Sequence, residues 1–341
     1  MSRGGLPGSE HRCDPGSFFA PPPNVALLGR AAQDAIVVAN RRLCREHYRL
    51  TLRLCALGPA RPGQFVHLCP TTGGTESGPT NGHSERGEAL NPWIRAFTVP
   101  MLRRAFSIAG LRRGNGDVEV DVIYRVVGTA SRWMESLRMD DVVSLLGPLG
   151  NAFPISVSKS QAWLVAGGVG LPPMLWLAEA LHAAHKNAVA FCGAQRAELL
   201  ALTVDAGCPP DRTAARATAS VQEFVRHGAP VVISTDDGSL GFRGYVGSAM
   251  AAHFEMSRPG VDDVVVYTCG PEPMMRYVAE FCIARNMECY VCVERNMACG
   301  TGMCQSCVVP VRDTRDPEGW SYRLCCTDGP IFEARNILWD T

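Results

Sequence analysis

Apolar and polar residues alternate through the first part of the chain, which is the period of a half-buried β-strand. AIVVANRRLC (35–44) and YRLTLRLCAL (48–57) follow this alternation and predict an antiparallel pair. Further strands are predicted over 61–70, 102–110, 118–128 and 142–150, and a short helix over 131–137. Together these elements predict a six-stranded antiparallel barrel.

Two polar segments have no such period. Residues 1–33 begin with a Gly-, Pro- and Ser-rich stretch and are predicted to be a disordered extension. Residues 71–93 are rich in Gly, Ser and Thr and are predicted to be a surface loop inserted in the barrel unit, 34–155.

The pattern changes near residue 160, where buried apolar runs alternate with amphipathic stretches. The runs predict strands over 161–168, 187–195, 230–237 and 262–270, and the stretches predict helices over 172–185, 247–254 and 272–286. Strands that alternate with helices predict a doubly wound parallel α/β unit, here 160–285. A cysteine-rich third unit is predicted over 286–341.

Composition excludes several classes of protein. Hydrophobic residues make up 46% of the 341 residues, enough for a sizeable core, and 33 basic residues balance 33 acidic ones. This neutrality gives no reason to expect nucleic acid or an anionic membrane as a partner. No apolar run reaches the roughly 18 residues of a spanning helix, and the first residues lack a secretory signature. A cytoplasmic protein with reduced cysteines is therefore expected.

The strongest chemical signal is the run Cys299-Gly-Thr-Gly-Met-Cys304-Gln-Ser-Cys307. Its C-x4-C-x2-C spacing is that of plant-type [2Fe–2S] sites, which need a fourth cysteine further along the chain. Cys325 or Cys326 could supply it. Gly300 and Gly302 would let backbone amides turn toward the sulfur atoms.

Two other interpretations of these cysteines exist. Cys289-x2-Cys292 and Cys304-x2-Cys307 resemble the two halves of a zinc ribbon. That site would leave Cys299 and one of the later cysteines unused. Buried free thiols are the third interpretation, and the density of cysteines between 299 and 326 argues against it.

Glycine turns follow two strands of the parallel unit. The first is Gly167-Gly168-Val-Gly170-Leu-Pro-Pro, and the second is Cys269-Gly270-Pro271. Both would lie at the carboxyl edge of the sheet, where ligands bind, and the helix that follows favours a pyrophosphate. A tight turn without a ligand would have the same composition.

The barrel carries two further motifs that could hold a diphosphate. One is the strand Arg103-Arg104-Ala-Phe106-Ser107. The other is the strand end Tyr124-Arg125, followed by the turn Gly128-Thr129-Ala-Ser131 at a helix N-terminus. An arginine on a barrel strand is commonly only solvated, so each motif is weak alone.

In this order the motifs resemble the ferredoxin–NADP reductase superfamily, in which R-x-[FY]-S and GxxS/T bind FAD, and GGxGxxP and CGPxPM bind a nicotinamide nucleotide. The cysteine segment is similar to the electron-transfer subunits of NAD-linked (type B) dihydroorotate dehydrogenase, which read E-x-R-M-A-C-G-x-G-x-C-x-x-C and then V-C-x-D-G-P. Residues 294–307 and 324–332 are similar to this pattern, and its Cys-x-Asp-Gly-Pro register selects Cys326 as the fourth ligand. The resemblance spans about residues 34–334 and does not include the extension or the 71–93 insertion.

The resemblance implies that electrons arrive singly through a [2Fe–2S] cluster on Cys299, Cys304, Cys307 and Cys326. FAD then collects two electrons and passes a hydride to NAD, with no separate catalytic acid, base or nucleophile. The cofactor-binding residues that it implies are Arg104, Phe106, Ser107, Tyr124, Arg125, Gly128, Thr129, Ser131, Gly167, Gly168, Gly170, Cys269, Gly270 and Pro271.

The resemblance also implies a partner, an FMN-containing dihydroorotate dehydrogenase catalytic subunit, in a heterotetramer that serves pyrimidine (UMP) biosynthesis. Two alternatives remain at this point. The same module occurs in glutamate synthase-like, sulfide and transhydrogenase complexes, so the chain could be an NAD(P)H-linked reductase with another partner. A zinc-binding regulatory protein is the non-enzymatic alternative.

Overall fold

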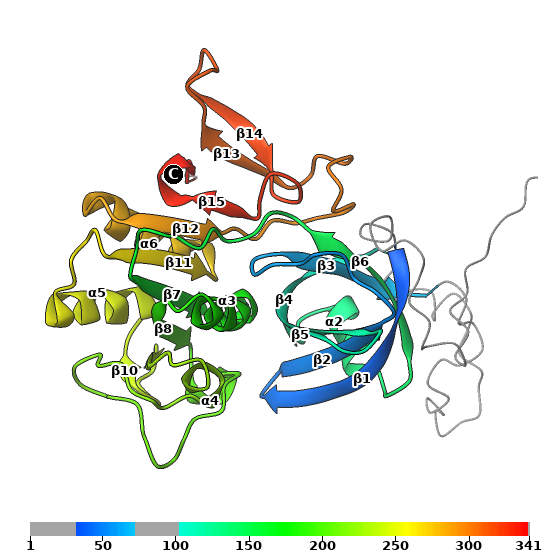
Figure 1. The fold of residues 1–341 in the computed structure, drawn as a ribbon, viewed down its shortest axis with the longest axis horizontal. Coiled ribbons are helices and arrows are strands. Elements are labelled where there is room, and N and C mark those ends of the chain that lie inside the picture. Colours follow the sequence, from blue (N-terminus) through cyan, green and yellow to red (C-terminus); the bar gives the residue numbers. More distant parts are fainter. Residues whose placement is uncertain (1–31, 72–101, 340–341) are drawn as a thin grey trace, which may run out of the picture.

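The computed structural model describes residues 32–71 and 102–339, and the fold has three parts (Figure 1). The predicted extension and insertion lie almost entirely outside the described residues. An antiparallel barrel and a parallel sheet stand side by side, and a two-stranded hairpin projects beyond them. Among the described helices, none is long and apolar enough to cross a membrane.

The barrel is closed in the order β1-β2-β5-β4-β3-β6, which confirms the predicted six-stranded antiparallel barrel. Leu50, Leu52, Val120 and Val122 alternate with outward residues and fill its core. Strand β1 begins at Ala32, inside the segment predicted to be disordered. The strands are β1 (Ala32–Cys44), β2 (His47–Leu54), β3 (Phe65–Pro70), β4 (Arg104–Arg113), β5 (Val118–Arg125) and β6 (Val142–Leu149).

The second sheet has the order β10-β9-β8-β7-β11-β12-β15, and its strands are parallel except for the edge strand β15. This confirms the doubly wound α/β fold. The strands are β7 (Gln161–Gly167), β8 (Asn187–Ala194), β9 (Val231–Thr235), β10 (Phe242–Arg243), β11 (Val264–Cys269), β12 (Glu288–Cys292) and β15 (Ile331–Glu333).

Helices cover both faces of this sheet because its strands are apolar on both sides. Helix α3 packs on one face and α5 and α6 pack on the other. Trp176 of α3 also reaches the barrel core, so this helix joins the two units. The helices are α2 (Thr129–Ser136), α3 (Leu171–Ala183), α4 (Gln222–Val225), α5 (Val246–Ser257) and α6 (Glu272–Ala284), with short 3-10 turns η2 (Gly168–Gly170), η3 (Ala197–Leu199) and η4 (Ala334–Asn336).

The predicted start of the cysteine unit at residue 286 is wrong. Strand β12 pairs in parallel with β11, and β15 pairs with β12, so both complete the nucleotide-type sheet. Tyr290 of β12 stacks on Tyr267 of β11 with 5.8 Å between ring centroids. Only the loop after β12, the hairpin β13 (Val308–Arg312) and β14 (Trp320–Leu324), and the turn before β15 stand apart from the sheet.

Candidate functional site

A cavity of about 1710 Å³ opens between the barrel, the parallel sheet and the cysteine loop. It exceeds the roughly 300–1,000 Å³ of a typical small-molecule site, so it has room for more than one ligand. Twelve of the predicted cofactor residues line it: Arg104, Phe106, Ser107, Tyr124, Arg125, Gly128, Thr129, Ser131, Gly167, Gly168, Cys269 and Pro271. Gly170 and Gly270 do not.

Arg103 lies just before β4 and Arg104 is the first residue of β4, and the two side chains make different contacts. The Arg103 guanidinium donates to the Ser144 hydroxyl at 2.7 Å and to the Ser144 carbonyl at 3.2 Å, which ties it to β6. Arg104 is exposed at the cavity wall, and within the described part of the chain it donates only to the carbonyls of Leu102 and Arg103, at 3.1 and 3.2 Å. Arg104 is therefore the one available for an anionic ligand.

Aromatic rings form the barrel side of the cavity. Phe106 meets Tyr124 edge to face at 6.3 Å, and Tyr124 stacks on Tyr48 at 5.7 Å. The Tyr124 hydroxyl donates to Oδ1 of Asn40 at 3.1 Å, away from the cavity. Tyr124 thus offers a ligand its ring and not its hydroxyl.

The N-terminus of α2 faces the cavity. Ser131 is buried, and its hydroxyl accepts the amides of Val127 and Gly128 at 2.9 and 3.0 Å. This hydroxyl caps the helix, so a direct diphosphate contact, as predicted for Ser131, would compete with the cap. Gly128 has open space where a Cβ would be, and Thr129 is exposed. These two residues can admit a phosphate close to the helix dipole.

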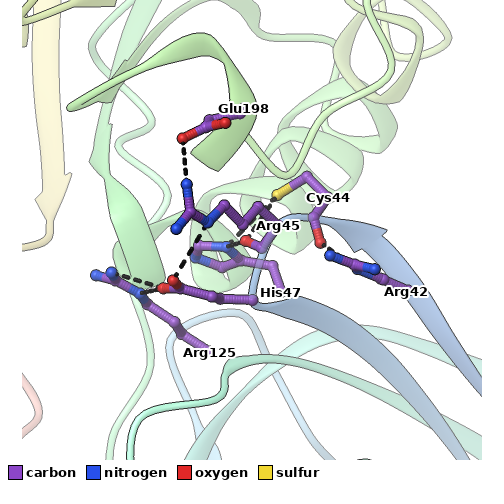
Figure 2. A network of polar contacts seen from close by, with 7 residues as sticks. Arg42, Cys44, Arg45, His47, Arg125 and Glu198 are labelled. Carbon is purple, nitrogen blue, oxygen red and sulfur yellow. Dashed lines mark hydrogen bonds and ion pairs between the residues drawn. The ribbon is translucent and has the colours of Figure 1, made fainter.

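Arg125 belongs to a polar network at the β1–β2 turn (Figure 2). Its guanidinium donates to Glu46 at 2.8 and 2.9 Å. The neighbouring Arg45 bonds Glu198 of η3 at 2.7 Å, and so connects the barrel to the α/β unit at the cavity rim. Bonding to Arg125 lowers the pKa of Glu46, which keeps this carboxylate ionised.

The two glycine turns of the sheet interlock. A Cβ on Gly170 would lie 2.0 Å from the carbonyl oxygen of Cys269. Gly270 has φ +154°, and a Cβ there would lie 2.9 Å from the carbonyl oxygen of Gly167. Gly170 and Gly270 therefore allow the backbones of the two turns to approach each other. Gly168 has φ +53°, and a Cβ built on it would have no neighbouring atom within 4 Å, so this position faces open space.

The four predicted ligand cysteines lie as two neighbouring pairs. Cys299 and Cys304 form one pair, and the Cys299 sulfur accepts the amides of Thr301 and Cys304 at 3.4 Å. The Cys307 sulfur accepts the Cys326 amide at 3.4 Å. Within residues 32–71 and 102–339, no group of three or more His, Cys, Asp or Glu side chains is arranged so that it could hold a metal ion.

The donor chemistry of this loop fits an iron–sulfur cluster. Gly300 and Gly302 have φ of +73° and +86°, which turns backbone amides inward as expected from the sequence. The amides of Thr301 and Cys304 lower the pKa of Cys299 to about 6. A thiolate is the form that binds metal. The loop flanks the cavity through Ala298 and Ser306.

The structure separates Cys325 from Cys326. The Cys325 thiol is fully buried and donates to the Val293 carbonyl at 3.2 Å. Cys326 hydrogen-bonds to Cys307 and accepts the amide of Gly302. This geometry favours Cys326 as the fourth ligand, in agreement with the family register.

The zinc-ribbon interpretation is wrong for its first half. Cys289 packs beside Cys282 of α6, while Cys292 hydrogen-bonds to Cys269 on the α3 side. Residues three apart on a strand point to opposite faces. Cys289 and Cys292 therefore cannot chelate one ion.

The depressed pKa of Cys299 predicts its reactivity in the metal-free protein. With a pKa of about 6, its thiolate fraction is about nine-tenths at pH 7, against about 1% for a thiol with pKa 9. We expect its iodoacetamide alkylation rate to rise through a midpoint near pH 6, followed by mass spectrometry. Buried Cys325, whose pKa is raised by burial, is the internal control and should stay unmodified. A Cys299 midpoint above pH 8 would contradict the prediction.

Several cavity residues were not predicted from the sequence. They are Gln195, Asp236, Tyr245, Tyr277 and the segment 292–298. Gln195 and Asp236 directly follow β8 and β9, so their position at the carboxyl ends of parallel strands was the available signal. Tyr245 and Tyr277 had none, because only folding brings α5 and α6 to this edge.

Comparisons with known proteins agree with this geometry. Residues 294–338 match a family model described as the iron–sulfur cluster binding domain of dihydroorotate dehydrogenase B. The chain is 31% identical over 318 residues to the dihydroorotate dehydrogenase B (NAD(+)) electron transfer subunit of Bacillus caldolyticus, which covers 92% of this chain and 100% of the relative. The subunit of Caldanaerobacter subterraneus subsp. tengcongensis is 29% identical over 305 residues, 89% of this chain and 98% of that relative.

Solved structures share the fold. An NADH-dependent reduced ferredoxin–NADP oxidoreductase superposes with a TM-score of 0.66 at 23% identity, covering 89% of this chain and 90% of the other. The ferredoxin reductase in carbazole 1,9a-dioxygenase superposes with a TM-score of 0.53 at 19% identity, covering 75% and 66%.

Proposed function

The chain belongs to the family of dihydroorotate dehydrogenase B electron transfer subunits, and from this premise we propose that it passes electrons from a catalytic partner through a [2Fe–2S] cluster and FAD to NAD+. One observation carries the proposal: the flavin-type strand, the glycine turns and the cysteine loop all border a single cavity. Three motifs far apart in sequence have no other reason to meet there.

Cys299 and Cys304 from one pair, and Cys307 and Cys326 from the other, would hold the cluster. The amides of Thr301 and Cys304 point at the Cys299 sulfur, and such hydrogen bonds stabilise added negative charge on reduction. Cys304 is exposed, so this edge of the loop is accessible to a partner.

The barrel side of the cavity would hold the flavin. Bound FAD supplies the exchange between one-electron and two-electron transfer. Arg104 would offset diphosphate charge, the open turn at Gly128 and the Thr129 amide at the start of α2 would receive the phosphates, and the rings of Phe106 and Tyr124 would pack beside the cofactor. Ser107 offers a hydroxyl that has no side-chain hydrogen bond to the rest of the described chain.

The sheet side of the cavity would hold the nicotinamide nucleotide. Gly167 and Gly168 would admit it near the start of α3, and Cys269 and Pro271 border the same space. Gly170 and Gly270 hold the two turns together and act only through backbone position. We propose NAD(H) as the nucleotide.

The partner is a catalytic subunit, as the name of the relatives implies. We propose an FMN-containing dihydroorotate dehydrogenase chain in a heterotetramer. The proposed cluster needs its four cysteines as thiolates, which supports a reducing cytoplasm as the compartment.

The direct test uses the purified chain and its catalytic subunit. We expect about two irons per FAD and NAD+ reduction at 340 nm that needs dihydroorotate and both chains. Flavin-free protein that contains zinc would overturn the proposal. Flavin and cluster without transfer from dihydroorotate would leave a reductase that serves another partner.

Substitution of Arg104 tests the flavin side of the site. Arg104→Ala should raise the Kd for FAD roughly 10- to 100-fold, because a hydrogen bond to a charged group contributes about 1.5–3 kcal/mol. Flavin fluorescence during titration of apoprotein measures it. Arg103→Ala is the matched control, since it breaks the bond to Ser144 and should lower stability while FAD affinity stays nearly unchanged. The reverse outcome would assign the diphosphate to Arg103.

A further inference from the structure

His67 in β3 is a buried polar side chain that the proposed function does not use. Its ring is fully buried, and neither Nδ1 nor Nε2 has a hydrogen-bond partner within the described chain. An unpaired buried donor or acceptor is costly and therefore uncommon. The ring needs a partner that residues 32–71 and 102–339 do not provide.

The ring points toward the cysteine loop. A Cβ placed on Gly300 would lie 2.7 Å from Cε1, 2.9 Å from Nε2 and 3.0 Å from Nδ1 of His67. These three atoms form the polar edge of imidazole, so this edge faces the residue between Cys299 and Thr301. Gly300 allows the approach because it has no side chain.

Other neighbours of His67 do not satisfy the ring. Phe65, two residues earlier on β3, packs against it with 5.7 Å between centroids and itself borders the cavity. Arg103 donates to the His67 backbone carbonyl at 3.5 Å and not to the ring. His67 therefore lies on the same side of β3 as Phe65, the side that faces the loop.

The ring is neutral in this setting. Burial, with help from the charges of Arg103 and Arg104, lowers the pKa of His67 to about 4. A neutral imidazole carries one N–H donor. This gives the loop a single uncharged donor on a buried side chain.

We propose that the His67 imidazole donates a hydrogen bond to the iron–sulfur cluster and thereby raises its reduction potential. The inference rests on the proposed cluster at Cys299, Cys304, Cys307 and Cys326. Hydrogen bonds to cluster sulfur favour the reduced, more negative state, so loss of the donor shifts the potential downward. His67 would link a barrel strand to the electron-transfer centre.

The test compares the full chain with His67→Phe, which keeps a flat ring without a donor, and His67→Gln, which restores an N–H donor. Protein labelled with 15N-imidazole histidine is reduced and examined by pulsed EPR. We expect a weak 15N coupling in the unsubstituted chain and its loss in His67→Phe. An EPR-monitored titration should show a lower potential for His67→Phe and a value closer to the original for His67→Gln.

Each outcome has a separate meaning. A reduced-cluster signal without histidine coupling, or an unchanged potential in His67→Phe, would overturn the role of His67 and leave the proposed function intact. Absence of any cluster signal in the unsubstituted chain would overturn the proposed function itself. If His67→Phe does not fold, the coupling in the labelled unsubstituted chain and the potential of His67→Gln decide the matter.

Discussion

Cys326→Ser is expected to abolish the [2Fe–2S] cluster. Cys326 donates its amide to the Cys307 sulfur at 3.4 Å and accepts the Gly302 amide, so it completes the second cysteine pair. Serine oxygen is a poorer ligand than thiolate for iron–sulfur centres. Iron and sulfide content and the EPR signal after reduction should fall to background, and electron transfer to or from the partner should fall with them, while FAD stays bound.

Cys325→Ser is the matched control, one residue away. The Cys325 thiol donates to the Val293 carbonyl at 3.2 Å, and a serine hydroxyl can make the same bond. We expect normal iron content in this variant. A cluster that survives Cys326→Ser and disappears in Cys325→Ser would show that the ligand assignment is wrong.

Gly170→Ala should destabilise the α/β unit and remove nucleotide binding. The added methyl would lie 2.0 Å from the Cys269 carbonyl oxygen, in a contact between two backbones that has no flexible side chain to yield. Overpacking of this kind costs roughly 3 kcal/mol, and it would also push apart the turns on which NAD(H) is proposed to bind. Urea unfolding followed by tryptophan fluorescence, which includes buried Trp163 and Trp176, measures the loss of stability.

Gly168→Ala serves as the comparison for this prediction. Its Cβ would meet nothing within 4 Å, although φ +53° is strained for alanine, at a cost of about 1 kcal/mol. We therefore expect a smaller loss of stability than for Gly170→Ala. NADH titration should still show weaker binding, because the methyl would occupy the open side of the turn. Equal stability losses in both variants would contradict the interlocked arrangement.

The local pattern of apolar and polar residues was sufficient to predict most of the strands and helices. Alternation in AIVVANRRLC predicted β1, and continuous apolar runs predicted β7 and β11, because burial on one or both faces leaves a direct mark on composition. The barrel and the doubly wound sheet followed from those strands. The helix α2 and its glycine N-terminus were also recognisable.

Pairing between distant segments was not predictable in the same way. Strand β12 lies inside the cysteine-rich segment, and nothing in its five residues says that β11 is its neighbour. The bond that the Ser131 hydroxyl accepts from the Gly128 amide at the start of α2 is likewise not visible in the sequence, which predicted only a ligand contact for this residue. Gly170 and Gly270 look like ligand-contacting glycines in the sequence, whereas in the fold they permit one turn to touch the other.

The sequence by itself determined the redox character of this protein, because thiolate spacing and glycine positions within one short loop are local properties that cluster ligation demands. It also determined the two fold classes through the period of its apolar residues. Only the tertiary structure decided that the three motifs share one cavity, that Cys289 and Cys292 face apart, and that His67 of the barrel lies over Gly300. These are relations between residues far apart in the chain, and they arise from how strands and helices pack.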